Sequence, residues 1–194
     1  MKLYLPLKTA FSVIGLFLAA AVALDAAPAG LTEKEAKKFD RAVKSYYRKS
    51  SVENDRNDAA MTWVQTPQVE NEVRDTYYHL RAAVKNGRAL VFQIVAQKDY
   101  LTTSQIYDPN ASKWNSAVSE GNALLLESSV ATNPRKGTPV QYGFVKLSEP
   151  FLRKCKDTGF TVTVKHVEEG DETDFEVEPE LVTAFLKKYD EATQ

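Results

Sequence analysis

The dipeptide Asn86-Gly87 separates two stretches of mostly apolar residues, and this feature restricts the fold of the chain more than any other. The stretch before it alternates apolar with polar side chains, the apolar ones being Tyr78, Leu80, Ala82 and Val84. Residues 89–96 follow it and are almost all apolar. Asn and Gly both tolerate the positive φ of a type I′ turn, so this pattern predicts a β-hairpin. A helix over residues 77–85 is the alternative, because apolar residues there also fit a helical period.

Other short segments show the same two-residue period or end at turn residues, which is typical of β-strands. They are residues 62–65, 100–107, 124–130, 140–144, 160–165 and 175–177. The run from Leu90 to Val95 is apolar on both faces, so we expect a central strand that is covered on both sides. Long crossover helices between the strands are missing, which disfavours a parallel sheet. The sequence therefore predicts a mainly β fold, an antiparallel β-sandwich or open barrel of about seven strands.

Three helices are expected at the edges of this β-rich body. Thr32 and Glu35 have the spacing of a capping box, and apolar residues behind them recur at helical spacing over residues 33–49. This N-terminal amphipathic helix, placed at 31–50, has a polar side that is mostly basic. Ser148 is expected to cap a short helix over 150–156 before the last hairpin, and Pro179 to open a C-terminal helix. Residues 50–58 are polar and predict a loop, followed by one β-rich domain at 60–194.

The first residues have the composition of a secretory signal peptide. Lys2 and Lys8 are basic, residues 10–24 are almost wholly apolar, and small residues follow. This order predicts a signal peptide over 1–23, with cleavage possible as late as 26–29, and hence a periplasmic or secreted chain. An uncleaved anchor is the alternative, although the apolar run is shorter than the ~20 residues that span a bilayer. We expect no stable membrane insertion after cleavage. Asn110 begins a glycosylation sequon in an expected turn.

Composition argues against several classes of partner and cofactor. The chain has 25 basic and 26 acidic residues, so no strong overall field attracts it to nucleic acid. No Gly-rich loop that could hold a nucleotide follows a strand, and no metal-ligand spacing is present. The acidic stretch from Glu168 to Asp174 lacks the pattern of a calcium-binding loop. We therefore predict no cofactor and no metal.

Cys155 is the only cysteine, so the chain forms no internal disulfide. Its spacing from Phe151 and Leu152 places these side chains on one side of a helical turn, which favours a buried thiol. Cys155 and His166 are the candidates for a catalytic nucleophile and base, because such partners need no fixed spacing in the sequence. A secreted hydrolase that uses this pair, or a pair of carboxylates, is the alternative function.

The prediction that the sequence favours is a non-catalytic exported β-domain. It would bind a protein, an envelope component or a small apolar ligand. Tyrosine and tryptophan contribute most to interfaces, and the aromatic residues nearest the helix and loops are Tyr46, Tyr47, Trp63 and Trp114. Each of them could instead belong to the core.

Overall fold

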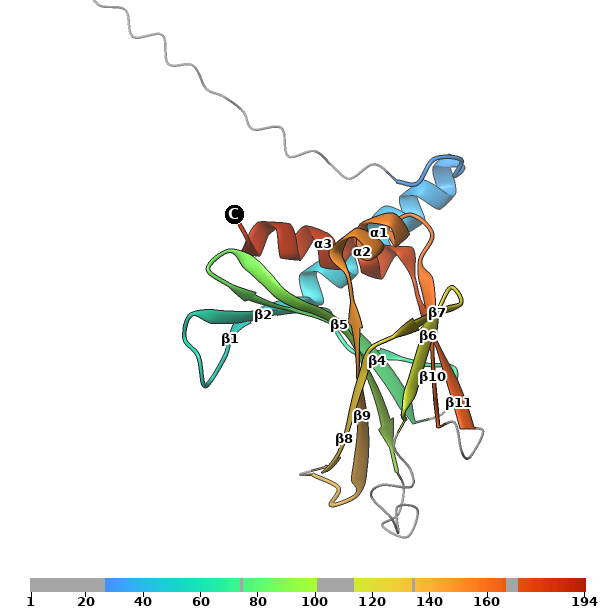
Figure 1. Ribbon diagram of the computed structural model, residues 1–194. Coiled ribbons are helices and arrows are strands. Elements are labelled where there is room, and N and C mark those ends of the chain that lie inside the picture. The colour runs from blue at the N-terminus through green and yellow to red at the C-terminus, as the bar shows by residue number, and fades with distance from the viewer. Residues whose placement is uncertain (1–26, 74, 101–113, 134, 167–170) are drawn as a thin grey trace, which may run out of the picture.

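A computed structural model describes residues 27–73, 75–100, 114–133, 135–166 and 171–194, and within these the chain folds into antiparallel sheets with three helices (Figure 1). The mainly β prediction is confirmed, and the arrangement is consistent with a β-sandwich. The signal segment, the Asn110 sequon and nearly all of the strand expected at 100–107 lie outside the described residues.

The larger sheet, sheet A, has seven strands in the order β1-β2-β4-β5-β9-β8, with β3 paired to β4. Its bounds are β1 Ser51–Asn54, β2 Met61–Gln65, β3 Val69–Glu70, β4 Thr76–Lys85, β5 Arg88–Asp99, β8 Leu126–Thr132 and β9 Pro139–Leu147. The prediction of a loop over 50–58 is wrong for Ser51–Asn54, because these residues form β1, which pairs antiparallel with β2. Most of β1 is exposed at the edge of the sheet, so backbone pairing forms this strand without an apolar period.

The predicted hairpin is confirmed by β4 and β5. Asn86 and Gly87 have φ values of 51° and 71°, as a type I′ turn requires. The inner part of β5 is buried on both faces, but Leu90 is 60% exposed, in contrast to the expectation for this run. Ala83 pairs with Val91 and Val84 with Ala89, so Leu90 is the extra residue of a β-bulge and has no partner in the ladder.

The smaller sheet, sheet B, has the order β11-β10-β6-β7. Its bounds are β6 Ser116–Ser119, β7 Asn122–Leu124, β10 Phe160–His166 and β11 Asp171–Val177. Leu124 and Leu126, expected on one strand, belong to different sheets, because the chain leaves sheet B after Leu124 and enters sheet A at Leu126. This crossover divides one expected strand into two. Together with β1, β3 and β6, which the sequence did not predict, it raises the number of strands within the described residues to eleven.

The helices are α1 Glu33–Lys49, α2 Glu149–Cys155 and α3 Pro179–Ala192. The capping box of α1 is confirmed, since Glu35 N–H donates to Thr32 Oγ1 and the Glu35 carboxylate accepts from Thr32 N–H. Ser148 caps α2 through a hydrogen bond from Phe151 N–H. The helices gather at one end of the sheets, and α1 packs against α3 (Figure 1). Among the described residues, no helix is long and apolar enough to cross a membrane.

The core lies between the inner face of sheet A and a second layer that consists of sheet B and α3. Toward α3, the ring of Phe92 makes edge contacts with Phe185 and Tyr189. Toward sheet B, Phe175 makes edge contacts with Tyr78 and Trp114. One face of sheet A is therefore covered by the core. The opposite face, which we call the outer face, is covered by no helix or strand that the structure describes.

Candidate functional site

The outer face of sheet A carries a cluster of aromatic side chains around a single arginine. We call this cluster the arginine patch, and its members are Trp63, Arg81, Gln93, Tyr142 and Phe144. The register places them on one face, since Arg81 pairs with Gln93 across β4 and β5, while Gln93 pairs with Lys146 of β9, two residues from Phe144. Residues two apart on a strand point to the same face. These side chains are buried or partly buried although no described element packs on them.

The guanidinium of Arg81 lies between two aromatic rings. Its central carbon is 4.4 Å from the ring centroid of Trp63 and 4.8 Å from that of Phe144. The ring of Phe144 stacks in turn on Tyr142, with centroids 6.1 Å apart and an interplanar angle of 14°. Arginine favours such contacts because its planar cation is weakly hydrated and is attracted to the negative face of an aromatic ring.

One hydrogen bond fixes the orientation of this guanidinium. Arg81 Nε donates to Gln93 Oε1 at 2.9 Å, and Gln93 is buried. The two terminal Nη nitrogens have no hydrogen-bond or ion-pair partner among the residues that the structure describes. Burial lowers the pKa of Arg81, but the guanidinium of arginine stays protonated in proteins. The patch therefore holds a positive charge that no carboxylate of the described residues neutralises.

His79 lies two residues before Arg81 on the same strand and the same face. Burial, and secondarily the charge of Arg81, lowers the pKa of His79 to about 4. The imidazole is therefore neutral at neutral pH and adds no second charge to the patch. A neutral imidazole offers both a donor and an acceptor nitrogen.

A shallow groove adjoins the patch at the edge of the sheet. It is lined by Trp63, Gln65 and Arg81 together with residues 53–57 of β1 and the following turn. Asp55 accepts a hydrogen bond from Trp63 Nε1 at 2.8 Å and two more from the backbone N–H groups of Asn57 and Asp58. These bonds lower the pKa of Asp55, and the bond from Trp63 Nε1 holds the indole over the guanidinium.

The structure separates the four aromatic residues that the sequence proposed for binding. Only Trp63 belongs to the arginine patch. Trp114 is 2% exposed and lies in the core, with its ring 3.0 Å from the position of a Cβ on Gly143. Tyr46 and Tyr47 connect α1 to α3, since their hydroxyls donate to Glu178 and Glu191 at 2.9 and 2.5 Å.

The structure does not bring Cys155 and His166 together. Cys155 ends α2 and is 1% exposed, and burial raises the pKa of its thiol. Gly159 N–H donates to the Cys155 carbonyl, so the cysteine lies beside the start of β10. His166 lies at the other end of this strand, which at ~3.3 Å per residue is roughly 20 Å away.

A second groove gathers carboxylates along β11 and β3. It is lined by Val69, Glu70, Asn71, Glu72, Val73, Tyr78, Glu172, Asp174, Glu176 and Glu178. All of its acidic residues are exposed, whereas the carboxylic acid of a glycosidase is kept protonated by apolar surroundings. No group of three or more His, Cys, Asp or Glu side chains in the described part of the chain could hold a metal ion.

The sequence did not identify Arg81, Gln93 and Phe144 as members of one site. In the sequence, Arg81 is one of the polar residues that alternate with apolar ones before the Asn-Gly turn, and Phe144 is one of the residues that line the expected strand at 140–144. The signal that could have found them is a long cation and aromatic residues at outward positions of neighbouring strands, but it requires the strand order, which places β9 next to β5.

A scan against protein-family models finds no family that matches this chain, and a comparison with curated proteins finds no significant match.

Proposed function

We propose that the chain is an exported, non-catalytic binding module, and that the arginine patch receives the ligand. The observation that supports this most directly is the state of Arg81. Its guanidinium is partly buried between two rings and has no carboxylate partner among the described residues. A desolvated charge without a counterion is costly, and a ligand anion would offset that cost.

The chemistry of the patch selects a ligand with two parts. A carboxylate can accept two parallel hydrogen bonds from the Nη nitrogens of an arginine. A flat apolar part next to it would pack on the partly exposed rings of Trp63 and Phe144, as aromatic rings in binding sites commonly do. Two acidic residues line the adjoining groove, Glu53 and Asp55, and both already accept hydrogen bonds from neighbouring residues. The ligand class is thus a carboxylate that carries a planar apolar group.

The chain offers an internal probe for this proposal, because it has only two tryptophans. Their indole N–H groups give separate signals in a nitrogen–proton correlation spectrum, and Trp63→Phe assigns them. Titration with benzoate should shift the Trp63 signal and leave the Trp114 signal in place, since Trp114 lies in the core. Benzamide, which has the same shape without the charge, should have little effect.

Arg81→Gln is the decisive variant, and Arg88→Gln, at an exposed position on β5, is its matched control. Benzoate should shift the Trp63 signal in the control but not in Arg81→Gln. At a benzoate concentration about five times the dissociation constant, the wild-type chain should gain ~1 kcal/mol of stability. An equal response to benzamide, or a response that Arg81→Gln retains, would contradict the proposal.

A further inference from the structure

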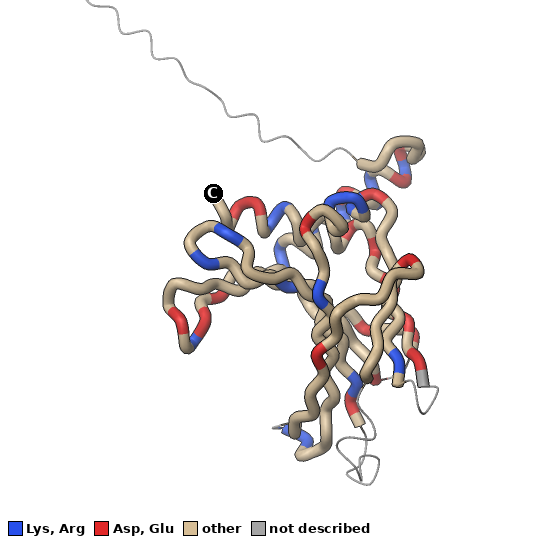
Figure 2. The backbone as a smooth tube through the Cα atoms, in the orientation of Figure 1, with Lys and Arg blue, Asp and Glu red and all other residues tan. Residues whose placement is uncertain are grey.

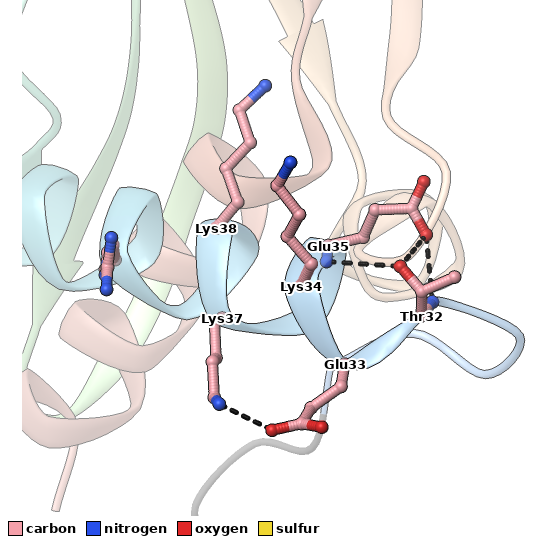
Figure 3. Close-up of a pocket in the computed structure, with 7 residues that line it drawn as sticks. Thr32, Glu33, Lys34, Glu35, Lys37 and Lys38 are labelled. Atoms are coloured by element: carbon pink, nitrogen blue, oxygen red, sulfur yellow. Dashed lines mark hydrogen bonds and ion pairs between the residues drawn. The ribbon is translucent and has the colours of Figure 1, made fainter.

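Helix α1 presents a basic surface that the arginine patch does not use. Lys34, Lys38 and Arg41 are exposed and follow one another at positions i, i+4 and i+7, so they lie on one face of the helix. Figure 3 shows Lys34 and Lys38 extending in the same direction, away from the ion pair of Lys37 with Glu33. We call these three residues the basic stripe.

The acidic residues nearby do not neutralise the basic stripe. Glu33 pairs with Lys37 at 2.5 Å, and the Glu35 carboxylate is held at the helix start by Thr32. The hydrogen bonds from Thr32 lower the pKa of Glu35, so its carboxylate stays charged and bound to Thr32. Within the described residues, none of the three basic side chains has an ion-pair partner.

The stripe lies on the part of the molecule that extends furthest from the sheets. The first buried residue of α1 is Phe39, so the two turns before it contact little else. In Figures 1 and 2 this end of α1 projects beyond the other helices. A flat surface could therefore approach the stripe without touching sheet A or sheet B.

The sequence before α1 indicates what kind of surface would approach the basic stripe. Residues 10–24 are almost wholly apolar, and nine residues separate them from the stripe. A segment of this kind is inserted into a membrane during export, before cleavage or as an anchor. The basic stripe then lies within reach of the lipid headgroups.

We propose that the basic stripe of α1 binds the surface of a bilayer that contains anionic lipids. The interaction is electrostatic, because the stripe itself offers little apolar surface. Each Lys or Arg next to an anionic leaflet strengthens binding about fivefold, so three of them should account for roughly 100-fold. The attraction should weaken steeply once the Debye length falls below ~10 Å, above about 0.1 M salt.

The experiment compares the full chain, expressed from its own first residue, in co-sedimentation with two kinds of vesicle. One kind contains phosphatidylglycerol and phosphatidylcholine, and the other contains phosphatidylcholine alone. The triple variant Lys34→Gln, Lys38→Gln, Arg41→Gln removes the stripe. The control Arg56→Gln, Arg88→Gln, Arg135→Gln removes the same charge from exposed positions on turns and on β5.

The wild-type chain and the control should bind the anionic vesicles roughly 100-fold more tightly than the neutral ones, and salt should remove the difference. The stripe variant should lose this preference by roughly 100-fold while its circular dichroism stays unchanged, since its residues are exposed. Equal binding to both vesicles, an equal loss in the control, or sedimentation without vesicles through self-association would overturn the proposal. All variants carry the same N-terminal segment, so the comparison between variants is the same whether or not this segment is cleaved.

Discussion

Gly159 lies so close to Val177 that a Cβ on the glycine would be 2.4 Å from the Val177 carbonyl oxygen. Gly159 has a φ of +68° and connects α2 to β10, while Val177 ends β11 just before α3. The backbone at this point therefore joins both packing partners of the core, sheet B and α3. Only glycine fits there, for two separate reasons, its φ and the lack of space.

The first prediction uses this contact. Gly159→Ala should lower the free energy of unfolding by about 3 kcal/mol, because a left-handed backbone and a collision with a carbonyl act together. Gly137→Ala is the control, since Gly137 has a φ of +67° and nothing within 4 Å of its Cβ position. It should lose only about 1 kcal/mol. Urea unfolding measures both, and equal losses would refute the steric argument.

The second prediction concerns stability in acid. The pKa of His79 is about 4 in the folded chain, below the ordinary value of 6.5. The unfolded chain therefore takes up a proton first as the pH falls from about 6.5 to 4, and the folded state loses stability over this window. The loss should reach about 2–3 kcal/mol at pH 4.

His79→Gln should remove this part of the acid sensitivity. The difference in unfolding free energy between wild type and variant should be constant above pH 7 and should change progressively below pH 6.5. Carboxylates titrate in both proteins and cancel in the difference. A difference that does not depend on pH would show that His79 is not buried in its neutral form.

The third prediction concerns the contact between α1 and α3. Burial, followed by the hydrogen bond to Glu178, raises the pKa of Tyr46 to about 12. Tyr46→Phe should cost about 1 kcal/mol by removing a hydrogen bond to a charged acceptor. A double-mutant cycle with Glu178→Gln should give a coupling energy of at least ~0.5 kcal/mol. Additive effects would mean that the bond contributes nothing to the stability of the folded chain.

The fourth prediction concerns Cys155. Cys155 is buried and the pKa of its thiol is raised, so only a small fraction is present as the thiolate that reacts with an electrophile. Labelling of the native chain with iodoacetamide should be roughly 100-fold slower than labelling in urea, because it requires local opening. Rapid labelling of the native chain would instead indicate an accessible, reactive cysteine.

Local chemistry explains which elements could be predicted from the sequence. The bounds of α1 follow from the capping box and the helical period, and the β4–β5 turn follows from the backbone preferences of Asn86 and Gly87. Strand β1 could not be found in this way, because its polar residues form a strand only by pairing with β2. The change of sheet between Leu124 and Leu126 also depends on long-range pairing.

The candidate site shows the same division. The amino-acid pattern alone predicts that residues alternate between two faces along β4, and so that Arg81 points away from Leu80 and Ala82. The sequence also placed Trp63 among the aromatic candidates for ligand binding. The folded structure was needed to show that Trp63 and Phe144 both contact the same guanidinium and that Trp114 is buried. Alternation is fixed by the local backbone, whereas the neighbours of a side chain across a sheet are fixed by the order of strands that are distant in the chain.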